Sequence, residues 1–331
     1  MTSSGDVVVV TGASAGVGRA IAHAFARRGH GVALLGRASA PLEDVRREVD
    51  AAGGRGLAIP TDVASAEAVE AAAERVEAEL GPIGIWVNNA MVTIYAPASA
   101  MRAEEYAQVT AITYLGIVHG TLAALRRMRP RDRGMIIQIG SALAYAAIPL
   151  QSAYCAAKFA ARGFTDSIRA ELLHDRSKVR VSTVHLPAIN TPQFVWARSR
   201  LPCETQPVPP IFAPEVAAGA VLFAADRAWR EVHLGGPSAM TILGSRLAPG
   251  LLERHLAKAA WEGQQTDTPA EGERIGNLEA PAVGHALRGP FADKARDRTL
   301  PLWLTTFPLA SLAAGLVLVL LLVGLVVLVL A

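Results

Sequence analysis

The first 36 residues contain the pattern that most limits the possible folds: an apolar run, a glycine-rich turn, a helix and a second apolar run. Residues 7–10 are four valines, and residues 11–18 read Thr-Gly-Ala-Ser-Ala-Gly-Val-Gly. Gly29 then ends the helical pattern, as glycine often does. Because a helix N-terminus after such a turn favours anions, we predict that it binds the pyrophosphate of a dinucleotide. The residues assigned to this role are Gly12, Ser14, Gly16, Val17 and Gly18.

A cation follows the second apolar run. Residues 31–36 are predicted to be a strand, and Arg37 comes next, about twenty residues beyond the glycine turn. In dinucleotide-binding folds this position lies beside the adenosine ribose, where an acid suits NAD and an arginine suits the 2′-phosphate of NADP. Arg37 therefore favours NADP(H) over NAD(H). The alternative is that Arg37 is an ordinary solvated arginine at the end of a strand.

Strand and helix patterns continue to alternate along the chain, which is typical of a doubly wound α/β fold. The expected strands are residues 7–10, 31–36, 56–59, 83–87, 135–140, 179–186 and 232–235. The expected helices between them are residues 41–52, 65–80, 103–128, 152–174 and 214–225. Polar residues repeatedly follow the strands, among them Asp62, Asn88 and Asn190. Ligands of open α/β sheets bind at that edge, so we expect the site there.

Three residues in the middle of the chain suggest a catalytic group. Tyr154 and Lys158 are four residues apart in a helical pattern, so their side chains project from one face. Ser141 ends the apolar run 135–140, at the carboxyl end of a predicted strand. A tyrosine that acts as a base near neutral pH needs its pKa lowered from about 10 to near 7, and a neighbouring ammonium can contribute to this. We predict that Ser141, Tyr154 and Lys158 are catalytic.

Together these residues resemble the short-chain dehydrogenase/reductase family over about residues 5–236. The matching elements are Thr11-Gly12-x-x-x-Gly16-x-Gly18, Asp62, Asn88-Asn89-Ala90, Ser141, Tyr154-x-x-x-Lys158 and Pro187-x-x-x-Thr191. The resemblance implies a Rossmann-type parallel sheet of about seven strands and an NAD(P)(H)-dependent oxidoreductase. It also implies a carbonyl or alcohol substrate and a homodimer or homotetramer.

The resemblance also implies roles for single residues. Tyr154 exchanges a proton with the substrate oxygen, Lys158 holds the nicotinamide ribose and lowers the tyrosine pKa, and Ser141 bonds the substrate oxygen. The further cofactor contacts implied are Asp62, Val63, Asn89, Pro187 and Thr191. Where the family often has an asparagine that supports proton relay, this chain has Thr113, which can hold a water but is not an amide. We expect Thr113 to take that place in the catalytic site. The family's Pro-Gly is here Pro187-Ala188.

Other classes of function have little support in the sequence. A net charge of +3 without a basic, aromatic-rich cluster argues against nucleic-acid binding. The two cysteines, Cys155 and Cys203, cannot form a disulfide framework, and no metal-ligand spacing is visible. Residues 191–213 form an irregular stretch, which we interpret as a substrate lid, with a surface excursion as the alternative.

The C-terminal third departs from the family pattern. Residues 1–245 form the predicted catalytic domain, 246–262 an amphipathic helix that packs on the domain or lies on a membrane, and 263–300 a linker. Residues 301–331 are predicted to be a transmembrane anchor, because the 23 residues 309–331 carry no charge. As a helix they measure about 35 Å, enough to cross a bilayer. Basic residues precede them, which places the catalytic domain on the cytoplasmic side.

These observations lead to a membrane-tethered NADP(H)-dependent oxidoreductase with an apolar carbonyl or alcohol substrate. A catalytically weak NADP-binding scaffold or redox sensor is the alternative from another class, and Thr113 is the residue in its favour. A sugar-nucleotide epimerase or dehydratase fits poorly, because its usual Gly-x-x-Gly-x-x-Gly turn is not present.

Overall fold

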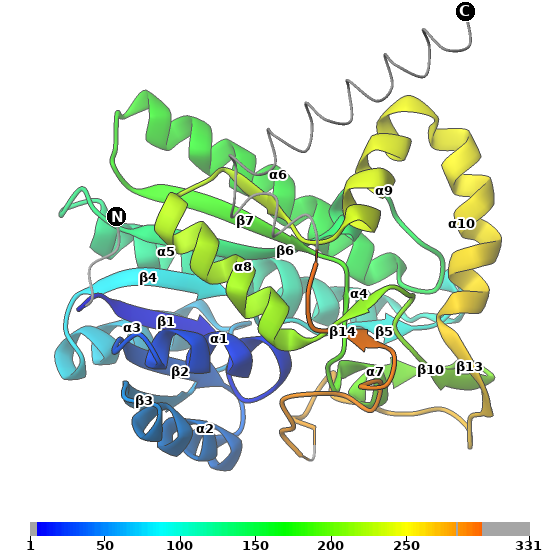
Figure 1. Cartoon of the computed structure of the whole chain (residues 1–331), viewed down its shortest axis with the longest axis horizontal. Coiled ribbons are helices and arrows are strands. Elements are labelled where there is room, and N and C mark those ends of the chain that lie inside the picture. Colours follow the sequence, from blue (N-terminus) through cyan, green and yellow to red (C-terminus); the bar gives the residue numbers. More distant parts are fainter. Residues whose placement is uncertain (1–4, 283, 300–331) are drawn as a thin grey trace, which may run out of the picture.

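A computed structural model describes residues 5–282 and 284–299. Its centre is a sheet of parallel strands in the order β12-β7-β6-β4-β1-β2-β3 (Figure 1). The strands are β1 (Val7–Thr11), β2 (Gly31–Gly36), β3 (Arg55–Pro60), β4 (Ile83–Asn88), β6 (Met135–Ser141), β7 (Arg180–Leu186) and β12 (Glu231–His233). The predicted Rossmann-like α/β fold with seven parallel strands is thus confirmed.

Helices cover both faces of the sheet. One layer contains α1 (Gly16–Ala26), α2 (Ser39–Ala51) and α8 (Pro214–Arg227), and the other contains α3 (Ala66–Glu79), α5 (Gly116–Met128) and α6 (Ser152–His174). Strand β1 shows why four consecutive valines suit the centre of this fold. Val8 and Val10 pack into the first layer, whereas Val7 and Val9 pack into the second. Alternating side chains of a strand buried on both faces must all be apolar.

The helix expected over residues 103–128 is interrupted. It consists of α4 (Ala103–Thr110), a π-helical turn over Ala111–Leu115 and α5. Within the described part of the chain, Ala103–Met128 is the one stretch of helix long and apolar enough to cross a membrane, but more than half of its apolar window is buried in the protein. It is therefore a core helix of this domain.

The helix expected over residues 246–262 begins earlier and is divided. α9 (Gly236–Leu247) and α10 (Pro249–Gly263) meet at Ala248, and Pro249 starts the second helix. Proline suits a first helical turn because its missing N–H would have no partner there. Leu252 and Leu256 are partly buried and Ala260 is buried, whereas Leu247 and Leu251 are exposed. The stripe therefore packs on the domain at its C-terminal half only.

Residues 264–299 pack on the catalytic domain, although they are expected to form a linker. β13 (Gln265–Pro269) pairs with β10 (Cys203–Thr205), and β14 (Ala295–Arg296) pairs with β11 (Ile211–Phe212). Leu278 and Phe291 are buried. Isolated apolar residues anchor this segment, which is why it lacks a helical or strand period. The predicted transmembrane anchor lies outside the described residues.

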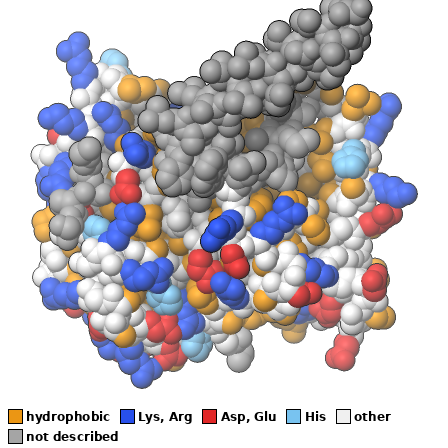
Figure 2. Space-filling model, viewed as in Figure 1, with side chains coloured by type: hydrophobic (Ala, Val, Ile, Leu, Met, Phe, Trp, Pro, Cys, Tyr) orange, Lys and Arg blue, Asp and Glu red, His pale blue; other side chains and the backbone are white. Residues whose placement is uncertain are grey.

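The remaining short elements lie in the connections. They are β5 (Ile94–Tyr95), β8 (Ala188–Ile189), α7 (Gln193–Trp196), β9 (Arg198–Ser199) and the 3₁₀ turns Ala98–Ala100 and Ala142–Ala144. In the view of Figure 1, the orange C-terminal segment, which contains β14, lies beside α7 and on the side of the molecule opposite α6. On the face of the molecule that Figure 2 shows, basic and acidic side chains are intermixed.

Candidate active site

A cavity of about 420 Å³ lies at the carboxyl edge of the sheet. The strand order explains its position. From β1 the chain continues to β2 on one side of β1, and it later returns to β4 on the other side. The connections that follow β1 and β4 therefore diverge and leave a crevice between them. The sequence-predicted residues that line it are Gly12, Ser14, Gly16, Val17, Arg37, Asp62, Val63, Asn89, Ser141, Tyr154, Lys158, Pro187 and Thr191. Gly18 and Thr113 are the two predicted site residues that do not.

The glycine turn is held in shape by Asn89. Its side-chain amide donates hydrogen bonds to the backbone oxygens of Thr11 (2.9 Å) and Gly12 (3.2 Å). Gly12 adopts a φ of +64°, a conformation that side chains disfavour. A Cβ on Gly18 would overlap the Gly12 oxygen and lie 2.6 Å from the Asn89 amide nitrogen. The absence of a side chain at Gly18 thus allows helix α1 to pack against the turn, and the hydrogen bonds of Asn89 hold the turn in its conformation.

The residues around this turn fit a dinucleotide. Helix α1 starts at Gly16, and the N–H groups of its first turn have no acceptor within their own helix; the Gly16 N–H donates instead to the Ala286 oxygen (3.2 Å). A Cβ on Gly16 would lie 3.0 Å from the Thr191 methyl carbon, so only a bare backbone leaves room at this position. Arg37 adds a cation on the same side of the cavity. Backbone donors, a narrow approach and a cation are together suited to phosphate groups.

Ser141, Tyr154 and Lys158 meet at the other end of the cavity. Ser141 is the last residue of β6, and the other two lie one turn apart in α6. The Lys158 ammonium donates to the Ile139 oxygen (2.8 Å) and lies 5.5 Å from the centre of the Tyr154 ring. Burial lowers the pKa of Lys158 to about 8.

The expected depression of the Tyr154 pKa is wrong for this arrangement. Burial raises the pKa of the phenol above its ordinary value, and a hydrogen bond with Ser141 offsets only part of that rise. The Lys158 ammonium, 5.5 Å from the centre of the Tyr154 ring, does not outweigh this effect of burial. Tyr154 is therefore protonated and able to donate a proton over the whole neutral range.

Thr113 is not part of the cavity, in contrast to its predicted place there. It is fully buried in the π-helical turn. Its hydroxyl accepts a hydrogen bond from the Val92 N–H and donates one to the Val92 oxygen, both at 3.0 Å. Thr113 thus fixes the loop after β4, and its one proton is already committed.

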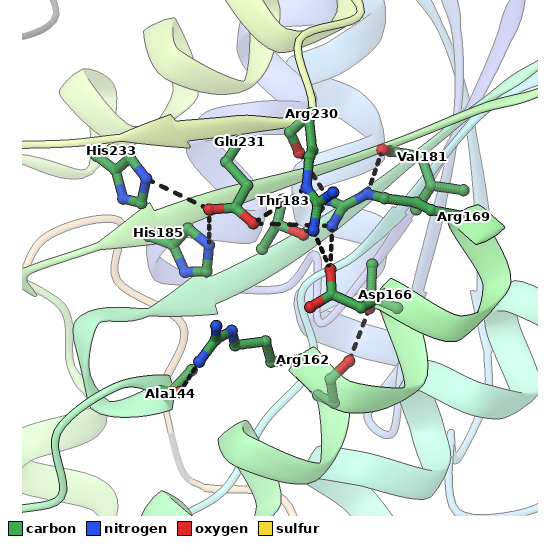
Figure 3. Close-up of polar contacts among 12 residues, drawn as sticks. Ala144, Arg162, Asp166, Arg169, Val181, Thr183, His185, Arg230, Glu231 and His233 are labelled. Carbon is green, nitrogen blue, oxygen red and sulfur yellow. Dashed lines mark hydrogen bonds and ion pairs between the residues drawn. The ribbon is translucent and has the colours of Figure 1, made fainter. Parts of the chain in front are cut away.

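A polar network lies behind the loop that follows Ser141 (Figure 3). Glu231 lies between His185 and His233, at 3.7 Å and 3.4 Å from their Nε2 atoms. His185 Nδ1 lies 3.4 Å from the Ser141 carbonyl oxygen, and the Tyr145 hydroxyl donates to Glu231. Burial lowers the pKa of His185 to about 4, so this histidine is neutral at pH 7. The network supports the Ser141 loop from behind.

The sequence analysis missed a buried glutamine pair that closes the substrate end. Gln151 donates to Gln264 (2.7 Å), and Gln264 in turn donates to the Pro149 oxygen (3.0 Å). The pair joins the end of α10 to the loop before Tyr154, and Leu256 and Ala260 of α10 line the cavity beside it. The apolar stripe of α10 indicated packing, but nothing in the sequence indicated a cavity wall.

The family model of the short chain dehydrogenase matches residues 6–200, more than half of the chain. The chain belongs to the short-chain dehydrogenase family. The uncharacterized oxidoreductase YxnA of Bacillus subtilis is 32% identical over 319 residues, which cover 94% of this chain and 89% of YxnA. The probable oxidoreductase EphD of Mycobacterium tuberculosis is 40% identical over 189 residues, but these cover only 56% of this chain and 32% of EphD.

Solved structures of the short-chain dehydrogenase family share the fold. An alcohol dehydrogenase of the archaeon Thermococcus sibiricus, complexed with 5-hydroxy-NADP, is 26% identical with a TM-score of 0.61, covering 70% of this chain and 95% of the other. A short-chain type dehydrogenase/reductase of Mycobacterium marinum is 25% identical with the same TM-score and coverage. This short-chain dehydrogenase is thus an oxidoreductase of a family that uses NAD(P).

Proposed function

We propose that the protein transfers a hydride between NADP(H) and the carbonyl or alcohol carbon of a small, mostly apolar molecule. The observation that carries this proposal is a single cavity that joins the glycine turn and Arg37 at one end to Ser141, Tyr154 and Lys158 at the other. Family membership makes the chain an oxidoreductase, and this geometry supports a reaction at a carbon–oxygen bond.

The chain's own residues would manage the substrate oxygen and its proton. Tyr154, protonated at neutral pH, donates its proton to the oxygen of a bound carbonyl as the carbon is reduced, and it accepts the proton in the opposite direction. The Ser141 hydroxyl donates a hydrogen bond to the same oxygen and stabilises its developing charge. The Lys158 ammonium stabilises the tyrosinate left behind. When bound, the cofactor supplies or accepts the hydride.

An apolar substrate is favoured by the walls of the cavity beyond Tyr154. Many of the side chains that line the cavity are hydrophobic or aromatic, among them Val92, Tyr95, Ile148, Phe194, Trp196, Val208 and Leu256. Pockets of this type bind apolar groups and use few polar contacts for orientation. Part of the expected lid, residues 191–213, contributes Phe194, Trp196 and Val208 to this wall.

NADP(H) is proposed over NAD(H) because Arg37 lies on the adenosine side of the cavity, next to Ala38 and Asp62. The Thermococcus sibiricus enzyme, which shares the fold, was solved with an NADP derivative. A comparison of the affinities for NADPH and NADH, repeated with Arg37→Ala, tests this preference.

We further propose that the protein is tethered by residues 301–331, with its catalytic domain facing the cytoplasm, and that it forms a homodimer or homotetramer. The uncharged run 309–331 supports the tether. Extraction of membranes with alkaline carbonate tests the tether, and protease access from each side tests the orientation. Light scattering on the detergent-solubilised protein tests the oligomer.

The decisive experiment for the activity is NADPH oxidation by the full-length protein with a panel of apolar aldehydes and ketones. Tyr154→Phe should abolish turnover but keep cofactor binding. Tyr114→Phe is a matched control, because Tyr114 packs against Phe164 outside the cavity. Cofactor binding without turnover in the wild type, in either direction, would instead support the NADP-binding scaffold or redox sensor.

A further inference from the structure

The segment of residues 275–282 lies along the adenosine side of the cavity. Asn277, Pro281 and Ala282 line the cavity together with Arg37 and the glycine turn. This segment lies outside the stretch that matches the family model, which ends at residue 200. The wall that it forms therefore belongs to a part of the chain that the family model does not cover.

Three backbone oxygens of this segment hold the guanidinium of Arg37. Arg37 donates to the oxygens of Asn277 (2.6 Å), Leu278 (3.1 Å) and Ala280 (3.3 Å). An arginine has five N–H donors, so two remain. These acceptors are neutral, and among residues 5–282 and 284–299 no carboxylate forms an ion pair with Arg37. Arg37 is thus fixed in orientation without a direct ion pair, and the carboxylates of Asp62 and Glu279 act on its charge from a longer distance.

The segment itself is firmly attached to the domain. The Leu278 side chain is 1% exposed and belongs to the core layer of α3, α5 and α6. Arg198 donates to the Ile275 oxygen (2.9 Å) and pairs with Glu279 (2.6 Å). Further along, the Ala286 oxygen accepts from the Gly16 N–H (3.2 Å). A segment held at both ends can position a side chain that it contacts.

Contacts with the segment reduce the conformational entropy that Arg37 would lose on binding a ligand. A free arginine side chain loses much of its rotamer freedom when it is immobilised on a ligand. Here the ordering is already provided by the folded chain, which is the usual way in which a preorganised site gains affinity. Three bonds to one short segment also bias the guanidinium toward one place in the cavity.

We propose that residues 276–280 position Arg37 for the 2′-phosphate of NADP, so that this C-terminal segment determines the preference for NADP(H) over NAD(H). The proposal rests on the proposed function, because it requires a dinucleotide in the cavity. The backbone carbonyls of the segment accept hydrogen bonds from Arg37 and orient it, and Arg37 in turn binds the phosphate. Displacing the segment should therefore weaken NADPH binding while leaving NADH binding nearly unchanged.

Gly276 of this segment and Gly272, which lies just before it, offer a matched pair of variants. Gly276 has a φ of +69°, and a Cβ there would overlap the Arg198 nitrogen and lie 2.6 Å from the Trp196 oxygen. Gly272 also has a positive φ (+124°), but a Cβ there would meet nothing within 4 Å. Gly276→Ala must shift the segment, whereas Gly272→Ala strains the backbone in open space. Neither variant changes a charge near the cavity.

The experiment measures the dissociation constants of NADPH and NADH by calorimetry for the full-length protein. Gly276→Ala should weaken NADPH about tenfold and NADH less than twofold, and Gly272→Ala should change neither by more than twofold. Leu278→Ala should act like Gly276→Ala, with Leu172→Ala, a buried leucine of α6, as its control for lost stability. In an Arg37→Ala background, Gly276→Ala should no longer change the ratio of the two constants.

The outcomes separate this proposal from the proposed function. An equal loss of both nucleotides in Gly276→Ala would show that the segment is only a wall, and tighter NADPH binding would show that it competes with the phosphate. Either result overturns the positioning role while leaving NADP binding intact. If the wild type binds neither nucleotide, the proposed function itself fails, and the positioning role fails with it.

Discussion

The carboxylate of Glu105 offers the sharpest test of how this structure is held together. Glu105 lies in α4, and its side chain is 1% exposed. One oxygen accepts from Arg198 (2.8 Å) and Arg200 (2.6 Å), and the other accepts from Arg200 (2.9 Å) and the Arg102 N–H (2.8 Å). These contacts hold the pKa of Glu105 far below its ordinary value of 4.5, with the Arg200 hydrogen bonds as the largest cause.

Glu105→Gln keeps the size of the side chain and removes its charge. It leaves Arg198 buried, with only the more exposed Glu279 as an acidic partner. Breaking a buried pair from one side costs about 3–5 kcal/mol. Since 1 kcal/mol shifts the midpoint of a domain of this size by about 2–4 °C, we expect the midpoint of thermal unfolding to lie roughly 6–20 °C lower. Differential scanning fluorimetry at pH 7 measures this shift.

The pH dependence provides a second check. A depressed carboxyl pKa in the folded state means that the ionised Glu105 stabilises the protein above pH 4.5, and that this contribution is lost as the pH falls below that value. The difference between the unfolding midpoints of the wild type and Glu105→Gln should therefore become smaller as the pH is lowered. Glu104→Gln, an exposed neighbour, is the control. Equal midpoints for the two variants at pH 7 would refute the reasoning.

Three further predictions concern the active site. Because burial lowers the Lys158 pKa to about 8, its ammonium loses a proton as the pH rises through 8. The value of kcat/KM for NADPH should therefore fall above pH 8. A kcat/KM that stays constant from pH 7 to 9 would contradict this. Gly18→Ala should weaken cofactor binding at least tenfold, as measured by calorimetry, because its Cβ would overlap the Gly12 oxygen. Gly29→Ala is the control, since a Cβ there meets nothing within 4 Å. Equal cofactor affinities of the two variants would contradict the predicted effect of the clash. Thr113→Val should lower stability by about 1–3 kcal/mol through the lost Val92 bonds but leave kcat within about twofold; a tenfold loss of kcat at full stability would restore Thr113 to the proton relay.

The catalytic domain could be predicted from sequence because its signals are local and repeat. The four valines of β1 need both faces covered, and Gly12 marks a turn that only glycine adopts easily. Tyr154 and Lys158 project from one face of α6 because they are one helical turn apart, and the end of β6 brings Ser141 to them.

What the sequence could not indicate depends on contacts between distant residues. The hydroxyl of Thr113 is used by Val92, and this bond exists only after β4 and the π-helical turn have packed. The segment of residues 275–282 has no periodicity, because its attachments are the one buried side chain of Leu278 and contacts with distant residues. Arg198 bonds to its Ile275 oxygen, and Arg37, some 240 positions earlier, donates to its Leu278 oxygen. The pKa of Tyr154 depends on how deeply α6 is buried, which spacing does not reveal.

The pairing of β14 with β11 fixes the chain to the domain as far as Arg296. The uncharged run begins at residue 309, so twelve residues, 297–308, connect the two. Even a fully extended chain of that length reaches about 40 Å. In the proposed tethered protein the domain would therefore be confined to a layer about as thick as its own diameter above the bilayer. A substrate dissolved in the lipid would then meet this enzyme by lateral diffusion in two dimensions, at a local concentration set by the lipid volume.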